Sequence, residues 1–171
     1  THASVFSVAI IVGLTFSLLV CAGVSRWLSP WQKERLRPYL QFYLQLFFTV
    51  LLLTSALKLV WGRVRYRQME EASQFCVWYL PCGVQGTSFP SGHTSSFAAT
   101  VLVVLSLRFP RLRSHARLIG AAVAGSILLM MLSRVIMGAH FVSDTAAGML
   151  IALGCWRFYD RRWEKWFYDH A

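Results

Sequence analysis

The feature that most constrains this chain is the distribution of its charged residues, which fall in short clusters between long apolar runs. No Lys, Arg, Asp or Glu occurs from Thr1 to Ser25. As a helix, this stretch is long enough to cross the roughly 30 Å hydrocarbon core of a bilayer. Four further apolar runs follow, at residues 39–57, 94–107, 118–132 and 141–156. This pattern predicts helices in a membrane, because lipid offers no hydrogen-bond partners to an open backbone.

The composition agrees with a membrane protein. Of the 171 residues, 56% are hydrophobic and 14% are charged, whereas a soluble domain has about 25% charged residues. The net charge of +10 does not indicate nucleic-acid binding, because the basic residues do not line one hydrophilic face. We predict an all-α, polytopic membrane helical bundle with five spans, which forms a single membrane-embedded domain over residues 1–171 and has membrane lipids as partners.

The basic loops predict the orientation. Five spans would place the loops 26–38 and 108–117 on one face and the segments 58–93 and 133–144 on the other. The two loops are rich in Lys and Arg, so the positive-inside rule assigns them to the cytoplasm. The segments 58–93 and 133–144 are then expected to face outward.

The first outward cluster contains Lys58, Arg63, Arg65 and Arg67. A guanidinium is a planar fork that matches two phosphate oxygens, and a lysine adds a compact charge. The alternative is a set of basic anchors that extend from a helix end to the membrane surface.

The second cluster is Pro90-Ser91-Gly92-His93, immediately before an apolar run. Ser91 can donate its hydroxyl, Gly92 can offer an unobstructed N–H at a helix N-terminus, and His93 can act as a general acid. The alternative is a helix cap followed by an incidental histidine.

The third cluster contains Ser133-Arg134, His140 and Asp144. The i,i+4 spacing from His140 to Asp144 places both on one helix face, where the carboxylate can orient the imidazole and make it more nucleophilic. A carboxylate at the start of an apolar helix is costly unless it is paired, which favours a functional role. The alternative is a structural Asp–His bond.

Together these clusters resemble the type 2 phosphatidic acid phosphatase superfamily, and specifically its bacterial-type membrane lipid phosphatases. The family pattern is Lys, six residues and Arg-Pro, then Pro-Ser-Gly-His, then Ser-Arg, five residues, His, three residues and Asp. The chain matches it from Lys58 to Asp144, except that Tyr66 stands where the family has proline. Members usually have six spans, so an N-terminal span is expected to be absent from this chain.

The resemblance implies a role for each matched residue. His140 would attack phosphorus to form a phosphohistidine, Asp144 would orient it, and His93 would protonate the leaving oxygen. Arg63 and Arg67 fall outside the matched positions and are assigned a secondary role. The implied phosphate ligands are Lys58, Arg65, Ser91, Gly92 and Arg134.

Such a cationic cradle supplies the charge that a metal would otherwise neutralise, so we expect no metal and no cofactor. The outward segments contain three carboxylates, Glu70, Glu71 and Asp144, too few for a typical two-metal site. A mononuclear site formed by His93, His140 and Asp144 is the alternative.

The sequence therefore predicts a metal-independent phosphatase that hydrolyses a lipid phosphomonoester or pyrophosphate. Its expected location is a bacterial inner membrane, with the site facing the periplasm or exterior. Candidate substrates are phosphatidic acid, phosphatidylglycerol phosphate, undecaprenyl pyrophosphate and the phosphates of lipid A. The alternatives are a lipid phosphotransferase that uses the same histidine and a non-catalytic lipid-phosphate binder. Cys76 and Cys82 share the outward loop, where an oxidising compartment would permit a disulfide.

Overall fold

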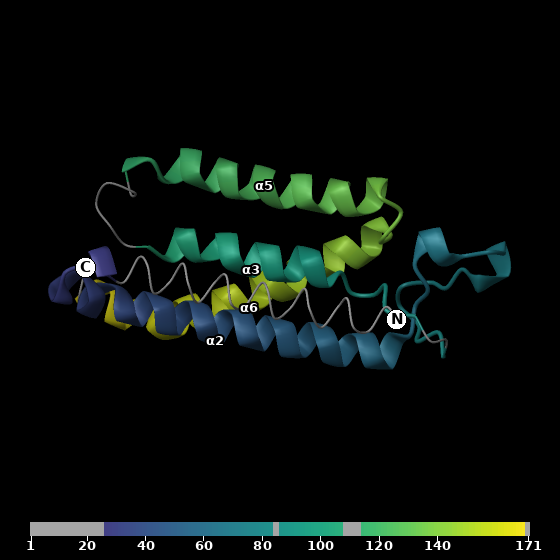
Figure 1. The fold of residues 1–171 in the computed structure, drawn as a ribbon, viewed down its shortest axis with the longest axis horizontal. Helices are drawn as coiled ribbons and strands as arrows, with labels where there is room; N and C mark the ends of the chain where they lie inside the picture. The colour runs from purple at the N-terminus through teal and green to yellow at the C-terminus, as the bar shows by residue number, and fades with distance from the viewer. Residues whose placement is uncertain (1–25, 84–85, 108–113, 170–171) are drawn as a thin grey trace. The chain divides into compact units, whose positions relative to one another are not determined.

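The computed structural model describes residues 26–83, 86–107 and 114–169, and within them all regular structure is helical. The α-helices are α2 (Pro30–Trp61), α3 (Gly92–Ser106), α5 (Ala116–Ile136) and α6 (Val142–Asp169), joined by the short 3₁₀ helices η1 (Tyr66–Gln68) and η2 (Ala72–Gln74). The predicted all-α class is confirmed for this part of the chain (Figure 1). The first predicted span, residues 1–25, lies outside the described residues.

Two segments are long and apolar enough to cross a bilayer. They are Pro30–Gln68, which contains α2, and Ala116–Ile136, which is α5. The apolar helix α3 is shorter, at 15 residues. On α5, Leu129 and Ile136 are 69% and 82% exposed, as expected of side chains that face lipid. The described residues thus contain two candidate spans, and the prediction of five is not confirmed.

The segment 26–38 is not the loop that its prolines suggested. Helix α2 already begins at Pro30 and contains Pro38. Ser29 and Gln32 form a reciprocal cap, with Ser29 N donating to Gln32 Oε1 at 2.8 Å and Gln32 N donating to Ser29 Oγ at 3.3 Å. Pro30 is compatible with the first helical turn, where its missing N–H has no helical partner to lose. Pro38 is an interior exception that the sequence rule did not anticipate.

The chain divides into two compact units, residues 1–40 and 41–171. In the second unit, α3 packs against both α5 and α6 (Figure 1). The part of α2 that belongs to this unit is bonded to α6 by Thr49 Oγ1 and Tyr159 Oη at 2.9 Å, and to α3 by Thr54 Oγ1 and Ser95 Oγ at 3.1 Å. Every residue of the candidate site lies in the second unit.

Two glycines end helices beside the site. Gly62 directly follows α2 and Gly138 lies just after α5, and both have positive φ, at 62° and 61°. A left-handed residue after a helix turns the chain away from the helix axis at little cost when it is glycine. These turns direct the segments that carry Arg63, Arg65 and His140 toward the N-termini of α3 and α6.

Candidate active site

The N-termini of α3 and α6 are joined through their first residues. Ser91, the N-cap of α3, accepts hydrogen bonds from Thr94 N at 3.4 Å and Thr94 Oγ1 at 3.0 Å, and its own N–H donates to the Asp144 carbonyl oxygen at 2.9 Å. A side chain added at Gly148 would lie 2.6 Å from the Ser91 carbonyl oxygen, so glycine permits this close approach. Ser91 is therefore a helix cap, as its alternative interpretation held, and it also lies against the Asp144 segment.

His140 and Asp144 lie together in the protein interior, at 3% and 0% exposed. His140 Nδ1 is 2.8 Å from the carbonyl oxygen of Ser88 and 3.8 Å from Asp144 Oδ2. A carbonyl oxygen can only accept, so Nδ1 carries the proton and Nε2 keeps its lone pair in the neutral ring. The expected Asp–His pair is present, but the closer partner of the imidazole is the backbone of Ser88.

Asp144 has hydrogen-bond partners for both carboxylate oxygens. Oδ1 accepts from Arg63 Nη1 at 2.6 Å. Oδ2 accepts from Ser88 Oγ at 2.5 Å and from the Phe141 N–H at 3.0 Å. A buried carboxylate is stable only with such compensation, and here the compensation also fixes the direction in which it faces His140.

The basic residues assigned to phosphate border this pair. Lys58 Nζ donates to the Thr87 carbonyl oxygen at 2.6 Å, and Arg65 Nη2 is 3.4 Å from Thr87 Oγ1. A side chain at Gly92 would lie 3.5 Å from Lys58 Cε, so Lys58 lies directly over the start of α3.

Three arginines of this region each have one buried donor without a hydrogen-bond partner. Among the described residues, the buried side-chain nitrogen and oxygen atoms without a hydrogen-bond partner are the Nε atoms of Arg63, Arg65 and Arg134. A buried donor left unpaired costs about 1–3 kcal/mol. Arg65 and Arg134 are only half-buried overall, whereas Arg63 is buried.

His93 is the second residue of α3, and it is partly exposed and partly buried. Burial of the imidazole lowers the pKa of His93 below its usual value, and the charges of Arg134, His140, Arg65 and Lys58 lower that pKa further. All four groups are therefore within electrostatic reach of one imidazole. Together with the contacts above, this brings the eight predicted site residues into one cluster.

Three residues of this cluster were not among the eight predicted site residues. Arg63 was assigned a secondary role, yet it is 2% exposed and paired with Asp144. Ser88 contacts both Asp144 and His140, and Thr87 contacts Lys58 and Arg65. The hydroxyl residues precede the Pro-Ser-Gly-His motif by two or three positions, and nothing in their local sequence distinguishes them.

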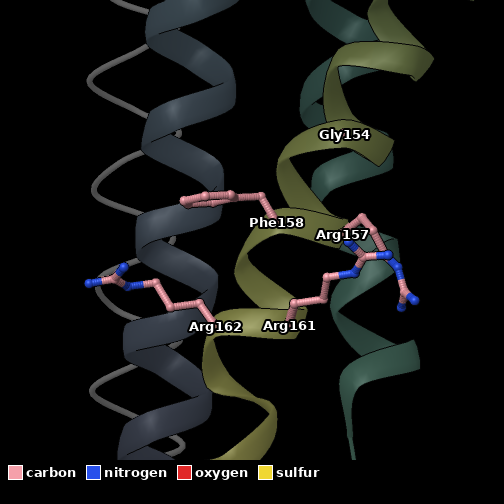
Figure 2. A pocket seen from close by; sticks show the side chains of 5 residues that line it. All are labelled: Gly154, Arg157, Phe158, Arg161 and Arg162. Atoms are coloured by element: carbon pink, nitrogen blue, oxygen red, sulfur yellow. The ribbon is translucent and has the colours of Figure 1, made fainter.

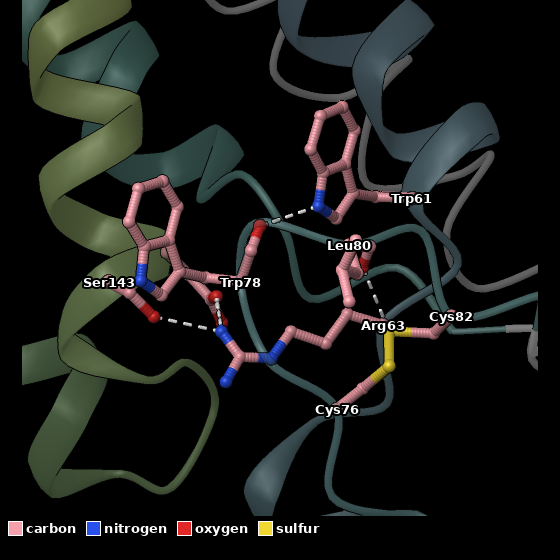
Figure 3. Close-up of a disulfide and its surroundings, with 8 residues drawn as sticks. Trp61, Arg63, Cys76, Trp78, Leu80, Cys82 and Ser143 are labelled. Atoms are coloured by element: carbon pink, nitrogen blue, oxygen red, sulfur yellow. Dashed lines mark hydrogen bonds and ion pairs between the residues drawn. A yellow bond between two sulfur atoms is a disulfide. The ribbon is translucent and has the colours of Figure 1, made fainter.

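The segment between η2 and α3 contains a disulfide between Cys76 and Cys82, shown in Figure 3. The loop is also attached to the end of α2, because Trp61 Nε1 donates to the Trp78 carbonyl oxygen at 2.6 Å (Figure 3). Next to the disulfide, the Phe75 ring lies 5.5 Å from the guanidinium carbon of Arg63. The disulfide that the sequence permitted is formed, and its loop covers part of the site.

Two of the hollows on the described surface bear on the position of the site. One of them, of about 420 Å³, borders the cluster, and its lining includes Lys58 and Thr87. The other, of about 610 Å³, is on the distant part of α6 (Figure 2), where its described lining is Gly154, Arg157, Phe158, Arg161 and Arg162. The larger hollow contains none of the predicted site residues, so size alone does not identify the site.

The described residues contain no group of three or more His, Cys, Asp or Glu side chains that could hold a metal ion. Asp144, the carboxylate of the proposed mononuclear alternative, is already bonded to Arg63 and Ser88. The donor set around His140 is cationic, and such a set suits an anion.

Comparison with known proteins gives two kinds of match. The model of the PAP2 superfamily matches residues 39–167. A lipid A 1-phosphatase of Rhizobium johnstonii is 37% identical over 114 residues, which are 65% of this chain and 43% of that protein. A lipid A 1-phosphatase of Rhizobium etli is 36% identical over 114 residues, 65% of this chain and 45% of that protein. The chain thus spans less than half the length of these curated relatives, and no solved structure matches it significantly.

Proposed function

This chain belongs to the PAP2 superfamily, and from that premise we propose that it is a membrane phosphatase that hydrolyses a lipid phosphate through a covalent intermediate on His140. The observation that carries the proposal is the hydrogen bond from His140 Nδ1 to the Ser88 carbonyl oxygen at 2.8 Å. It leaves Nε2 as the nucleophilic atom, in a cluster of cations suited to phosphate.

In the first step, the Nε2 lone pair attacks phosphorus as the bond to the leaving lipid oxygen breaks. His93 gives that oxygen a proton, so the lipid leaves as an alcohol. Lys58, Arg65 and Arg134 hold the non-bridging oxygens and stabilise the charge of the transition state. Asp144, which lies 3.8 Å from His140 Nδ1, stabilises the positive charge that the ring acquires.

In the second step, water attacks the phosphohistidine and gives a proton to the neutral His93. The P–N bond breaks, inorganic phosphate leaves, and both histidines return to their starting states. His93 is neutral here because it gave its proton to the leaving oxygen in the first step, so it can accept the proton from water. Phosphate bound in the cluster opposes the positive charges that lower the pKa of His93, which favours the protonated imidazole needed for the first step.

We propose that lipid A phosphate is the first substrate to test among the four candidates. Both curated relatives are named lipid A 1-phosphatases, at 37% and 36% identity. The site chemistry requires only a phosphate on a lipid, so phosphatidic acid, phosphatidylglycerol phosphate and undecaprenyl pyrophosphate are the comparison substrates.

We also propose that the site faces away from the cytoplasm. The Cys76–Cys82 disulfide lies in the loop beside the cluster, and disulfides persist mainly in oxidising compartments. With Ala72→Cys in this exposed loop, an impermeant thiol reagent should label intact cells. Labelling that requires lysis would reverse the orientation.

The decisive assay measures inorganic phosphate released by purified protein from the four lipid phosphates, with His140→Ala as the control. We expect release from lipid A phosphate, unchanged by EDTA, and a loss of at least about 10³-fold in the variant. Full turnover by His140→Ala would overturn the proposal. Labelled phosphate that appears on an acceptor lipid would identify a phosphotransferase, and activity that EDTA abolishes and a divalent metal restores would identify a metal site.

A further inference from the structure

Arg63 lies one residue beyond the glycine that ends α2, and it is buried together with a carboxylate. Its side chain is 3% exposed and that of Asp144 is 0% exposed. Arg63 Nη1 donates to Asp144 Oδ1 at 2.6 Å and to Ser143 Oγ at 2.8 Å. Figure 3 shows the guanidinium extending toward Ser143 at the start of α6. Arg63 thus connects the end of α2 to the first turn of α6.

The surroundings hold Arg63 in this position. Its guanidinium carbon is 4.0 Å from the centre of the Phe141 ring and 5.5 Å from that of Phe75, distances at which a cation is attracted to the ring face. Its carbonyl oxygen accepts from the Ser88 N–H at 2.8 Å. The same residue therefore contacts Asp144 through its side chain and positions Ser88, the other partner of Asp144, through its backbone.

This environment differs from that of the phosphate ligands. Arg65 and Arg134 are half-buried, and their strongest described partners are uncharged. Arg63 is deeper and already neutralises a carboxylate. A guanidinium that a buried carboxylate occupies has little charge left to give a substrate, so binding of phosphate is not its main role.

On the basis of the proposed function, we propose that Arg63 is a positioning residue that acts through Asp144 on the nucleophile His140. It holds Oδ1, which leaves Oδ2 to face Ser88, the Phe141 N–H and the imidazole. Without Arg63, a buried carboxylate would lose its only described ionic partner other than His140, and would turn or take up a proton.

The test is a double-mutant cycle with Arg63→Met, Asp144→Asn and the combined variant, assayed for lipid phosphate hydrolysis. We expect Arg63→Met to lower kcat by about 100-fold and to change KM by less than about three-fold, because substrate contacts remain. If Arg63 acts through Asp144, the combined variant should be within about three-fold of Asp144→Asn alone. The combined variant leaves no unpaired buried charge, so it is expected to fold even where Arg63→Met does not.

Two matched variants separate positioning from simple charge. Arg63→Lys keeps the charge and should recover part of the lost kcat, whereas Arg117→Gln removes an exposed arginine at the start of α5 and should leave kcat within about two-fold of wild type. In Arg63→Ala, added guanidinium should raise kcat, since it can occupy the same buried place beside Asp144.

Three results would overturn the inference while the wild type is active: an increase in KM at unchanged kcat, an unchanged kcat, or multiplicative losses in the combined variant. If the wild type releases no phosphate from any lipid phosphate, the proposed function fails and this inference fails with it. The wild-type activity therefore tests the function, and the ratios between variants test the role of Arg63.

Discussion

Two buried serine–aspartate pairs bind α6 to the chain around α3: Ser88 lies four residues before α3, and Ser106 is its last residue. Ser88 Oγ donates to Asp144 at 2.5 Å, and Ser106 Oγ donates to Asp160 at 2.6 Å. Both serines are 0% exposed, and the carboxylates are 0% and 5% exposed. The aspartates are separated by 16 positions on one helix, or about 24 Å at the α-helical rise.

The neighbours of the two pairs differ. Asp144 is paired with a buried arginine at 2.6 Å and faces His140. The described ion pair between Asp160 and Arg157 is longer, at 3.8 Å, and the Arg157 side chain is 57% exposed, so this pair contributes little. Ser106 also accepts from Trp156 Nε1 at 2.9 Å. The two serine–aspartate pairs thus differ in their surroundings, and the proposed function assigns the reaction to the pair beside an imidazole and a cluster of cations.

The strongest way to break this comparison is to neutralise each carboxylate in turn. Asp144→Asn should lower kcat by about 10³-fold, because the amide cannot stabilise positive charge on His140. Asp160→Asn should leave kcat within about two-fold of wild type, because its neighbours contact no reacting atom. Phosphate release would be measured on monodisperse protein, and equal losses in both variants would show that the two ends do not differ in function.

The pH dependence of the reaction sharpens the electrostatic side of the comparison. Burial and the nearby positive charges place the pKa of His93 below its usual 6.5, so the free enzyme loses this proton at a lower pH than an ordinary histidine would. Because the protonated form gives the proton to the leaving group, kcat/KM should fall as pH rises through a midpoint below 6.5.

His93→Gln should remove that limb of the profile and lower kcat/KM by about 10²-fold. In the wild type, the corresponding limb of kcat should lie at higher pH, because bound phosphate favours the protonated imidazole. A limb that survives in His93→Gln would assign the titration to another group.

The disulfide loop offers a smaller effect at the same end of the molecule. Cys76→Ser with Cys82→Ser should lower kcat a few-fold, on the order of three-fold, because the freed loop holds Phe75 less firmly over Arg63. Cys155→Ala, which removes the free thiol of α6, is the matched control and should show no such change. Dithiothreitol should reproduce the effect in the wild type and have none in the double variant.

The sequence predicted the all-α class of the described residues because apolar runs in this chain correspond to helices. Helices α3 and α5 lie where the runs at 94–107 and 118–132 indicated. The helix from Pro30 was missed because proline was interpreted only as a break, although the Ser29 and Gln32 cap is visible in the sequence. The predicted run ended at Trp156 because charged positions follow it. Helix α6 nevertheless continues to Asp169.

The residues of the candidate site that belong to a motif could be predicted, because the spacing within each motif is short. The motif residues cluster because each motif lies at a helix end, and helix ends can be located from sequence. The partners of Asp144 could not be predicted, since Arg63 lies 81 positions away and Ser88 lies 56 positions away. Which of three neighbouring arginines turns inward depends on the packing of Phe141 and Phe75, which no single-sequence pattern specifies.

The smallest effect on activity is expected from Ser106→Ala, at the end of α3 away from His140. The change removes the donor to Asp160 and the acceptor for Trp156, and it should cost about 1–3 kcal/mol of stability. The midpoint of thermal unfolding in detergent should fall by several degrees, roughly 2–4 °C for each kcal/mol, while kcat and KM stay within about two-fold of wild type. Ser88→Ala is the matched variant at the other end, and there kcat should fall together with stability because Asp144 loses a bond to Oδ2. If the Ser106→Ala variant is fully folded but has a lower kcat, the pair of Ser106 and Asp160 influences the reaction through α3 or α6.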